Sequence, residues 1–491
     1  MTTLFLLLFA CPPKGTGELS MPDAPSSPYP ETRTVEVVDD YHGTQVPDPY
    51  RWLEDSEDPE VRSWIGAQNA LTGAYLNTIP ERDAIRDRMT QLWDYERYSS
   101  PSHRNGRYFW YRNDGLQNQS VLYTADEPTA EGRVLLDPNL LSEDGTVALS
   151  GTWVNEDASL LAYAVSDAGS DWKTFHVRDI ESGEDLPDAI GRVKFSGVTW
   201  AKDGAGFYYT AYTEADIEDL EALNKQPSLY FHTLGESQDD DVVVYERPDE
   251  PEWGFGSSIT EDGRYLIISI WQGTEPKNRL LYKDLKSGGP VVELLMDFDA
   301  YYSVLGNDGP LWYIETDKDA PKGRVIAVDI RKPDAKNWKE VLPQGEDKLQ
   351  SVSLFGKRMV VNTLKDATSQ VRVLDLRSGK ELSTVDLPGL GTLDGFGGRR
   401  GDTETFYTFS DYLTPGTIYR YDIASGESTL FRAPAVSMDP EDYEVRQVFY
   451  ESKDGTRVPM FLVHRKGLEL DGQNPTYLYG YGGFDISLTP R

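Results

Sequence analysis

The sequence predicts a mainly β protein in which a seven-bladed β-propeller is inserted into a second, smaller domain. A unit that begins with a turn of Asn, Asp or Gly and continues as a strand of aromatic and aliphatic residues recurs seven times, at intervals of roughly 46 to 59 residues. Tyrosine supplies 29 of the 491 residues, as is common in β architectures whose strands are solvated on one face. Two helical patterns precede the first copy of the unit. A propeller flanked by parts of another domain accounts for all three observations.

The first 28 residues are interpreted as an export signal followed by a disordered tether. Residues 4–10 form an apolar run too short to span a bilayer, and Leu8-Phe9-Ala10-Cys11 resembles the cleavage box of a bacterial lipoprotein. Phe9 is bulky for such a box, and no Lys or Arg precedes the run. Cys11 is the one cysteine of the sequence, so it forms no intrachain disulfide and is a candidate lipid anchor. A periplasmic or lipid-anchored location is therefore favoured over a cytoplasmic one.

Residues 29–94 are assigned to the N-terminal part of the second domain. Residues 32–38 alternate like a strand. Helices are predicted from Pro59, which suits the first helical position, and from Pro80. Both helices carry apolar faces that need a surface to pack against: Val61, Trp64, Ile65, Ala70, Leu71, Tyr75 and Leu76 on the first, and Ile85, Met89, Leu92 and Trp93 on the second.

The propeller is assigned to residues 95–440. The interval between copies is close to the length of a four-stranded blade, so seven copies imply seven blades. A row of separate β-sandwiches is the alternative, but it would not explain so regular an interval. A further strand follows several copies, as at residues 280–285, 371–376 and 418–423. The seven copies cover residues 105–111, 157–163, 203–209, 262–268, 308–314, 355–361 and 402–408.

Residues 441–491 lie beyond the propeller. Residues 443–450 and 458–464 alternate around a turn at residues 453–456, which predicts a hairpin. We expect these residues to begin the C-terminal part of the domain that residues 29–94 start.

The last stretch with a recognisable pattern is residues 475–484, a short buried strand that runs into a glycine-rich turn. Gly480, Gly482 and Gly483 are expected to take backbone angles closed to other residues. In α/β-hydrolases a turn of this kind after a core strand supplies donors to the oxyanion hole. Tyr481 is the candidate donor here because no histidine heads the glycines. For the motif taken alone, a tight turn without a catalytic role is the favoured interpretation.

The charge of the chain excludes some classes of partner. The formal net charge is -34 at pH 7, and nucleic acid and anionic membrane surfaces require a basic stripe. The charge would attract cationic peptides over long distances, although a generally acidic soluble protein is the simpler interpretation. Residues 239–241, a run of three aspartates, are interpreted as a solvated loop.

The sequence contains no complete catalytic set. A nucleophile elbow needs Gly-x-Ser-x-Gly, and the nearest pattern, residues 254–258, lacks the closing glycine. The histidines lack the spacing of a metal site and are interpreted as surface or packing residues, so neither a metal nor another cofactor is predicted. The histidines are His42, His103, His176, His232 and His464.

With these elements placed, the chain resembles the prolyl oligopeptidase family, serine peptidases that cleave short peptides after proline. The matching stretches run from about residue 40 to residue 484, and they are highly specific. They cover residues 40–43, 48–55, 115–119, 136–139, 144–149, 169–172, 192–196, 452–456 and 478–484.

The resemblance implies a seven-bladed propeller inserted into an α/β-hydrolase domain, with short proline-containing peptides as substrates. It implies that Tyr481 donates to the oxyanion and that Phe195 lines an outer substrate subsite. The family's catalytic serine, aspartate and histidine, and the arginine that holds the substrate backbone, would all follow residue 491. The chain thus looks like the first two-thirds of such an enzyme, from a split gene, a truncated assembly or a deliberate fragment. We expect it to be inactive without the missing C-terminal hydrolase portion.

Two functions of other classes compete with the peptidase. A stand-alone propeller could serve as a binding module, but the hydrolase-type ends would have no use there. A propeller glycosidase would need a carboxylate pair, and the sequence singles out none.

Overall fold

The computed structural model describes residues 29–213, 226–484 and 486–491. The proposed signal, tether and Cys11 lie outside the described residues. The chain divides into two compact units. One contains the described residues up to Asp94 together with Pro475–Tyr479, and the other contains Tyr95–Asn474 and Gly480–Arg491. No helix in the described ranges has the length and apolar character needed to cross a membrane.

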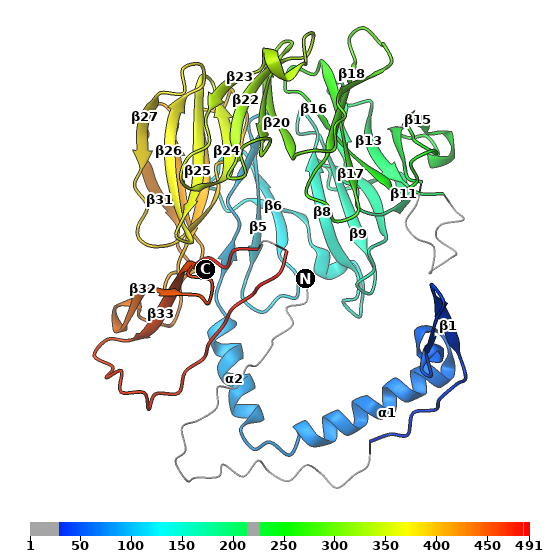
Figure 1. Ribbon diagram of the computed structural model, residues 1–491, viewed down its shortest axis with the longest axis vertical. Helices are drawn as coiled ribbons and strands as arrows, with labels where there is room; N and C mark the ends of the chain where they lie inside the picture. The colour runs from blue at the N-terminus through cyan, green and yellow to red at the C-terminus, as the bar shows by residue number, and fades with distance from the viewer. Residues whose placement is uncertain (1–28, 214–225, 485) are drawn as a thin grey trace. The chain divides into compact units, whose positions relative to one another are not determined.

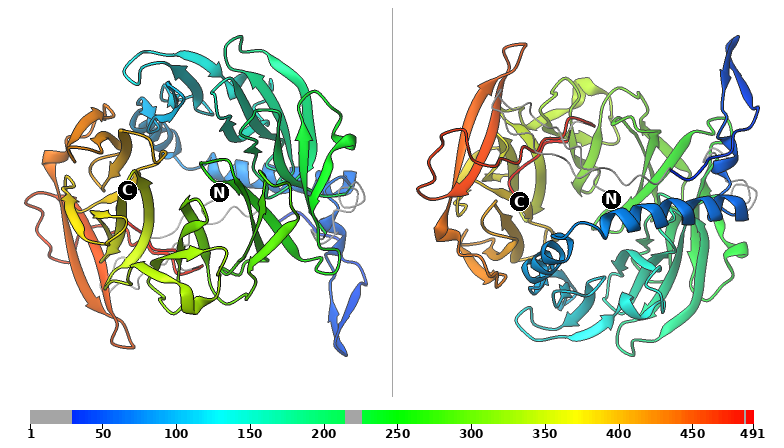
Figure 2. Two further views of the ribbon diagram at one scale, coloured as in Figure 1. Left: turned by 90° about the horizontal axis from the view of Figure 1, so that it is seen from above. Right: turned by 90° about the horizontal axis from the view of Figure 1, so that it is seen from below.

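The larger unit is a seven-bladed β-propeller, as predicted. Seven antiparallel sheets follow one another along the chain, and viewed end on they form a ring (Figure 2). The first sheet has five strands and the other six have four each, paired in sequence order. Every blade is therefore built from one continuous stretch of chain.

The strands of the first four blades are β3 (Arg97–Tyr98), β4 (Ser102–Arg104), β5 (Arg107–Asn113), β6 (Val121–Ala125) and β7 (Arg133–Leu136); β8 (Ala148–Val154), β9 (Leu160–Ser166), β10 (Lys173–Asp179) and β11 (Asp185–Val193); β12 (Thr199–Trp200), β13 (Gly206–Ala211), β14 (Ser228–Thr233) and β15 (Val242–Tyr245); and β16 (Trp253–Ile259), β17 (Tyr265–Gln272), β18 (Arg279–Asp284) and β19 (Val291–Leu295). Those of the last three are β20 (Tyr302–Asp308), β21 (Leu311–Thr316), β22 (Arg324–Asp329) and β23 (Lys339–Leu342); β24 (Lys348–Phe355), β25 (Arg358–Lys365), β26 (Thr368–Asp375) and β27 (Glu381–Val385); and β28 (Thr392–Gly395), β29 (Glu404–Ser410), β30 (Thr417–Asp422) and β31 (Ser428–Arg432). Short 3-10 helices also occur, at Pro138–Leu140, Gln238–Asp240, Ala335–Asn337 and Pro440–Asp442.

The repeated unit of the sequence is the second strand of each blade together with the turn before it. In β17, for example, Leu266 and Ile268 pack towards the third blade, whereas Tyr265 and Ile267 pack towards the fifth. Successive side chains of a strand point to opposite faces, so a strand buried on both faces appears as a continuous apolar run. The second strand of each blade can therefore be recognised in the sequence by its continuous apolar run.

The first and last blades share no strand, and side chains join them. The Tyr108 hydroxyl donates to Glu404 Oε1 at 2.7 Å, and the hydroxyls of Ser100 and Thr408 are 2.9 Å apart. The guanidinium of Arg432 lies 4.3 Å from the centre of the Tyr98 ring. Polar and cation–π contacts thus contribute to the closure of the ring.

The smaller unit contains the hairpin β1 (Val38–Tyr41) and β2 (Thr44–Pro47), the 3-10 helix Arg51–Glu54, and the helices α1 (Pro59–Leu76) and α2 (Arg82–Trp93) (Figure 1). The predicted helices are present, and Asp58 caps α1 by accepting the N–H of Glu60 at 2.7 Å. The strand expected at residues 32–38 is wrong for all but its last residue, because β1 begins at Val38, where its pairing with Pro47 begins. Ile85, Met89 and Leu92 on α2 are exposed.

After the propeller, the predicted hairpin is present but the predicted terminal strand is not. The expected hairpin is present as β32 (Tyr443–Glu451) and β33 (Arg457–Arg465). The expected buried strand at residues 475–479 is wrong: these residues form no strand, and Leu478 is 74% exposed. A strand needs a neighbour for its backbone hydrogen bonds, and none of the described strands pairs with this segment.

Candidate functional site

Phe195 lies in the connection between β11 and β12, with 51% of its surface exposed. Lys194 Nζ lies 5.1 Å from the centre of the Phe195 ring and 5.4 Å from that of Trp172. The Trp271 ring, at the end of β17, meets the Phe195 ring edge to face with 6.1 Å between centres. Phe195 is therefore an exposed aromatic surface held by a cation on one side and by another ring on the other.

The place of Trp271 depends on a glycine of the neighbouring strand. A Cβ at Gly254 of β16 would lie 2.0 Å from the Trp271 ring, far inside van der Waals contact. The residues 254–258 that came nearest to a nucleophile elbow thus lie within a strand, where the first glycine leaves room for Trp271.

Tyr481 is 48% exposed, and its hydroxyl makes no hydrogen bond within the described residues. The turn around it differs from expectation: Phe484, with a φ of 53°, takes the left-handed conformation, and Gly480, Gly482 and Gly483 do not. The N–H of Ile486 closes the turn on the carbonyl of Gly483 at 3.1 Å. No hydrogen bond or ring contact joins Tyr481 to Phe195 in the described part of the chain. The two residues predicted from the sequence are both accessible, but the described structure does not join them.

A cavity of about 550 Å³ is lined mainly by residues of blades one to four. Its lining includes residues of β4, β8, β12 and β16, together with Arg399 from the seventh blade. Five of its lining side chains can carry charge: His103, Arg104, Glu156, Lys202 and Arg399.

The loop between β28 and β29 brings Arg399 and Arg400 to residues of several other blades. Arg399 forms a two-point ion pair with Glu156 of the second blade, with Nη2 2.7 Å from Oε2. Arg400 Nη1 lies 2.8 Å from Asp308 Oδ1 of the fifth blade, and its backbone N–H donates to Glu261 of the fourth blade at 3.1 Å. The hydrogen bonds from Arg399 lower the pKa of Glu156 to about 2. This loop therefore ties together blades that are not neighbours in the ring.

His232 of β14 forms a buried ion network that sequence reasoning missed. Its Nδ1 lies 2.8 Å from Asp241 Oδ1, and its Nε2 lies 3.0 Å from Asp188 Oδ1 on β11 of the preceding blade. All three side chains are buried. Because both ring nitrogens face carboxylate oxygens, this geometry favours an imidazolium with a proton on each nitrogen. In the sequence His232 follows Leu229, Tyr230 and Phe231 within an apolar strand, and this context was the signal that could have indicated a buried histidine.

The same network corrects the interpretation of residues 239–241 as a solvated loop. Asp239 is exposed, as expected, but Asp241 is 1% exposed and also accepts the Tyr209 hydroxyl at 2.6 Å. The third aspartate of the run is therefore part of the core.

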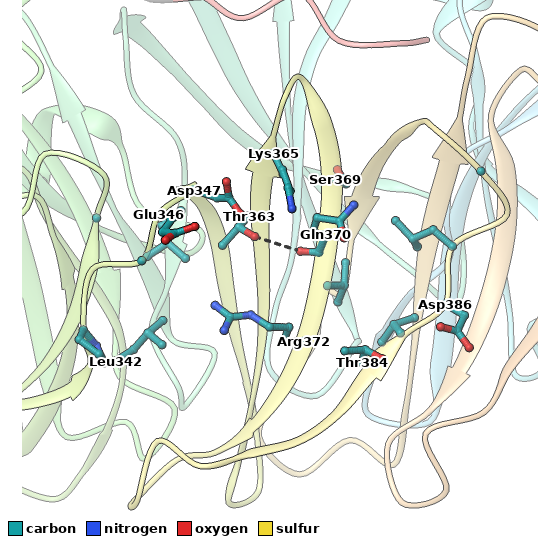
Figure 3. A pocket seen from close by; sticks show the side chains of 18 residues that line it. Leu342, Glu346, Asp347, Thr363, Lys365, Ser369, Gln370, Arg372, Thr384 and Asp386 are labelled. Carbon is teal, nitrogen blue, oxygen red and sulfur yellow. Dashed lines mark hydrogen bonds between the residues drawn. The ribbon is translucent and has the colours of Figure 1, made fainter. Parts of the chain in front are cut away.

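A second cavity, of about 540 Å³, lies between the fifth and sixth blades (Figure 3). Glu346, Asp347 and Asp386 contribute negative charge to its lining, and Lys365 and Arg372 contribute positive charge. Its mixed charges single out no reaction. Within the described ranges no group of three His, Cys, Asp or Glu side chains could hold a metal ion.

Comparison with known families gives these features a context. The family model described as the N-terminal β-propeller domain of prolyl oligopeptidase matches residues 29–434. The chain belongs to the prolyl oligopeptidase family. This match covers the whole propeller and the smaller unit's helices, so the resemblance first seen in short motifs extends over the described fold.

Relatives of similar sequence include a prolyl endopeptidase and a prolyl oligopeptidase. The prolyl endopeptidase of Elizabethkingia meningoseptica is 39% identical over 464 residues, which are 94% of this chain and 65% of that protein. The prolyl oligopeptidase A of Amanita bisporigera is 33% identical, over 94% of this chain and 66% of that protein. The chain thus spans about two thirds of the length of these relatives.

Solved structures of the family show the same fold. A structure from a study of two prolyl endopeptidases and the role of inter-domain dynamics superposes with a TM-score of 0.86 at 39% identity, over 94% of this chain and 68% of that chain. The prolyl oligopeptidase B of Galerina marginata, bound to a 35-residue hydrolysis and macrocyclization substrate, superposes with a TM-score of 0.85 at 32% identity, over the same shares. This relative therefore binds a peptide.

Proposed function

We propose that this polypeptide is the propeller-bearing part of a prolyl oligopeptidase, a serine endopeptidase that cleaves short peptides after proline. The observation that supports this most is the 39% identity to a prolyl endopeptidase over 94% of the chain. The sequence contains no Gly-x-Ser-x-Gly, so in this proposal the nucleophile belongs to the part of the relatives' length that this chain does not span.

In this proposal Tyr481 acts as an oxyanion donor. The serine of the remaining portion would attack the carbonyl that follows proline, while a histidine takes the serine proton. The negative charge then develops on the carbonyl oxygen, where the Tyr481 hydroxyl would donate a hydrogen bond. The exposure of Tyr481 and the absence of a hydrogen-bond partner within the described residues support this role.

Phe195 would line an outer substrate subsite. Its exposed ring offers apolar area to a substrate side chain, and Lys194 and Trp271 fix its position. The peptide bound to the Galerina marginata relative supports a peptide as the ligand.

The test is a chimera in which residues 1–484 are joined to the remaining portion of the Elizabethkingia meningoseptica enzyme. We expect the present chain to leave an N-acylated Gly-Pro p-nitroanilide intact and the chimera to hydrolyse it, with inhibition by a serine-directed phosphonate. Tyr481→Phe in the chimera should lower kcat about 100-fold to 1,000-fold, the usual effect of a lost oxyanion donor, with little change in KM.

Phe195→Ala should instead raise KM for a longer peptide while kcat for the short substrate stays the same. A folded chimera without activity, or serine-dependent cleavage by the present chain after removal of host peptidases, would contradict the proposal.

We also propose that Cys11 carries a lipid anchor outside the cytoplasm, which the box at residues 8–11 supports. Expression with a labelled fatty acid should label the chain, and Cys11→Ser should abolish the label. Label that persists in Cys11→Ser, or a cytoplasmic and unlabelled protein, would contradict this.

A further inference from the structure

The cavity among blades one to four differs in charge from the rest of the chain. The chain carries a formal net charge of -34, whereas Arg104, Lys202 and Arg399 face this cavity beside one carboxylate, Glu156. Glu156 already accepts hydrogen bonds from both Lys202, at 2.5 Å, and Arg399. The side chains that line the cavity thus include three cations and one carboxylate, and the charges of Asp402 and Glu261 also act on Arg104.

Arg104 is the cation in this lining that forms no hydrogen bond or ion pair with the described residues. Its side chain is half-buried at the end of β4. Burial lowers the pKa of the Arg104 guanidinium and the neighbouring charge of Arg399 lowers it further, whereas the charges of Glu156, Asp402 and Glu261 raise it. These carboxylates offset part of the repulsion by Arg399 but accept no hydrogen bond from Arg104, so its N–H groups remain open to an added acceptor.

The other groups near Arg104 leave it free to bind an added ligand. His103 uses Nε2 to accept the N–H of Gly106 at 3.1 Å and directs Nδ1 to Asp402 at 3.3 Å. The Ser258 hydroxyl lines the same cavity and makes no hydrogen bond within the described residues, so it is a further donor. About 550 Å³ is room for a short peptide as well as for an inorganic ion.

We propose that this cavity binds a small oxyanion, with Arg104 as its main ligand and Lys202, Arg399 and Ser258 as supporting donors. A planar guanidinium binds carboxylate or phosphate oxygens through two parallel hydrogen bonds, which suits a terminal carboxylate of a short peptide or inorganic phosphate. The proposal is independent of the proposed peptidase activity, because all four residues lie in the propeller.

The test is calorimetric titration of the whole chain at constant ionic strength, with inorganic phosphate in one arm. The other arms are an N-acetylated tripeptide with a free carboxylate and the same tripeptide as its C-terminal amide. We expect saturable binding of phosphate or of the free carboxylate, and none of the amide. Phosphate alone would identify the source as an inorganic ion, and the free carboxylate would identify it as a peptide terminus.

Arg104→Gln should weaken this binding by about tenfold to 100-fold, the effect of one lost charge-assisted hydrogen bond. The matched control is Arg331→Gln, which makes the same change in net charge at a side chain that is 69% exposed on the fifth blade. Without ligand, the melting temperature of Arg104→Gln should not fall, because the side chain has no hydrogen bond or ion pair to lose; this shows that the variant folds.

An absence of binding in every arm would overturn the proposal. Equal affinity in Arg104→Gln and Arg331→Gln would also overturn it, because the binding would then depend on general charge and not on this cavity.

Discussion

The imidazole of His232 lies between carboxylates of two different blades, and this position sets a pH dependence for the propeller. Burial by itself lowers the pKa of His232, but the hydrogen bonds of Asp241 and Asp188 outweigh it, so that the pKa is raised. The titratable hydroxyl of Tyr209 also faces this network through Asp241. A raised pKa in the folded state means that the charged ring stabilises the folded state at low pH.

We predict that this stabilisation is fully present below about pH 6.5, the ordinary pKa of histidine, and is lost as the pH rises through the folded pKa. His232→Gln should lower the free energy of unfolding at pH 6 by about 3 to 5 kcal/mol, because it leaves two buried carboxylates without their cation. Urea unfolding at pH 6 and pH 9 checks this. The difference between wild type and variant should shrink at pH 9, and His42→Gln, at an exposed histidine, should behave like wild type. A difference that does not depend on pH would show that the ring is neutral.

At the scale of elements, two strands of the fourth blade determine how the candidate peptide surface is presented. Gly254 of β16 leaves the space that Trp271 of β17 occupies, and Trp271 in turn supports Phe195 from the neighbouring connection. The backbone pairing of the two strands is regular here, with Gly254 opposite Trp271. The contact between Trp271 and Phe195 therefore depends on the absence of a Cβ atom at Gly254.

We predict that Gly254→Ala destabilises the protein by about 1 to 3 kcal/mol, the usual cost of overpacking, and moves Trp271 away from Phe195. Thermal unfolding and the tryptophan circular dichroism near 290 nm check the two effects. Gly256→Ala is the matched control on the same strand, because the nearest atom to its new Cβ would be 4.0 Å away. Equal effects of both substitutions would show that Trp271 has room to move without cost.

At the scale of the whole molecule, the propeller contains its own core, whereas the segments outside it expose apolar side chains. Trp312 and Ile314 of the fifth blade, for example, are fully buried against the fourth. Outside the propeller, Met89 is 64% exposed and Leu478 is 74% exposed. Each such side chain gains about 1.5–3 kcal/mol when it becomes buried, so these segments favour association.

We predict that limited proteolysis removes residues before about Tyr95 and after about Pro440 while the blades resist, and that the intact chain self-associates. Mass spectrometry of the fragments and sedimentation velocity check this. Leu478→Asp should reduce the association, whereas Leu140→Asp, at a propeller residue that is 81% exposed, should not. A monomer with equal resistance along its length would contradict the prediction.

Much of the fold could be predicted because each blade is a local structure. The copy at residues 262–268 ends within β17, and its apolar run follows from burial on both faces of one strand. The helix from Pro59 could be predicted equally well, because its capping residue and its apolar face lie within a few turns of the chain. The prediction of a strand at residues 475–479 was wrong because a strand depends on a partner that can be distant in the sequence. None of the described strands pairs with this segment.

The sequence by itself determined the number of blades and the hairpin after them, because these depend on residues close together in the chain. Only the tertiary structure decided which charged groups meet. Arg399 pairs with Glu156 across 243 positions, and His232 contacts Asp188 across 44. A carboxylate or guanidinium is usually a surface residue in a sequence-based interpretation. Its partner is selected only when the blades pack together, which buries the His232–Asp188 pair fully and the Arg399–Glu156 pair in part.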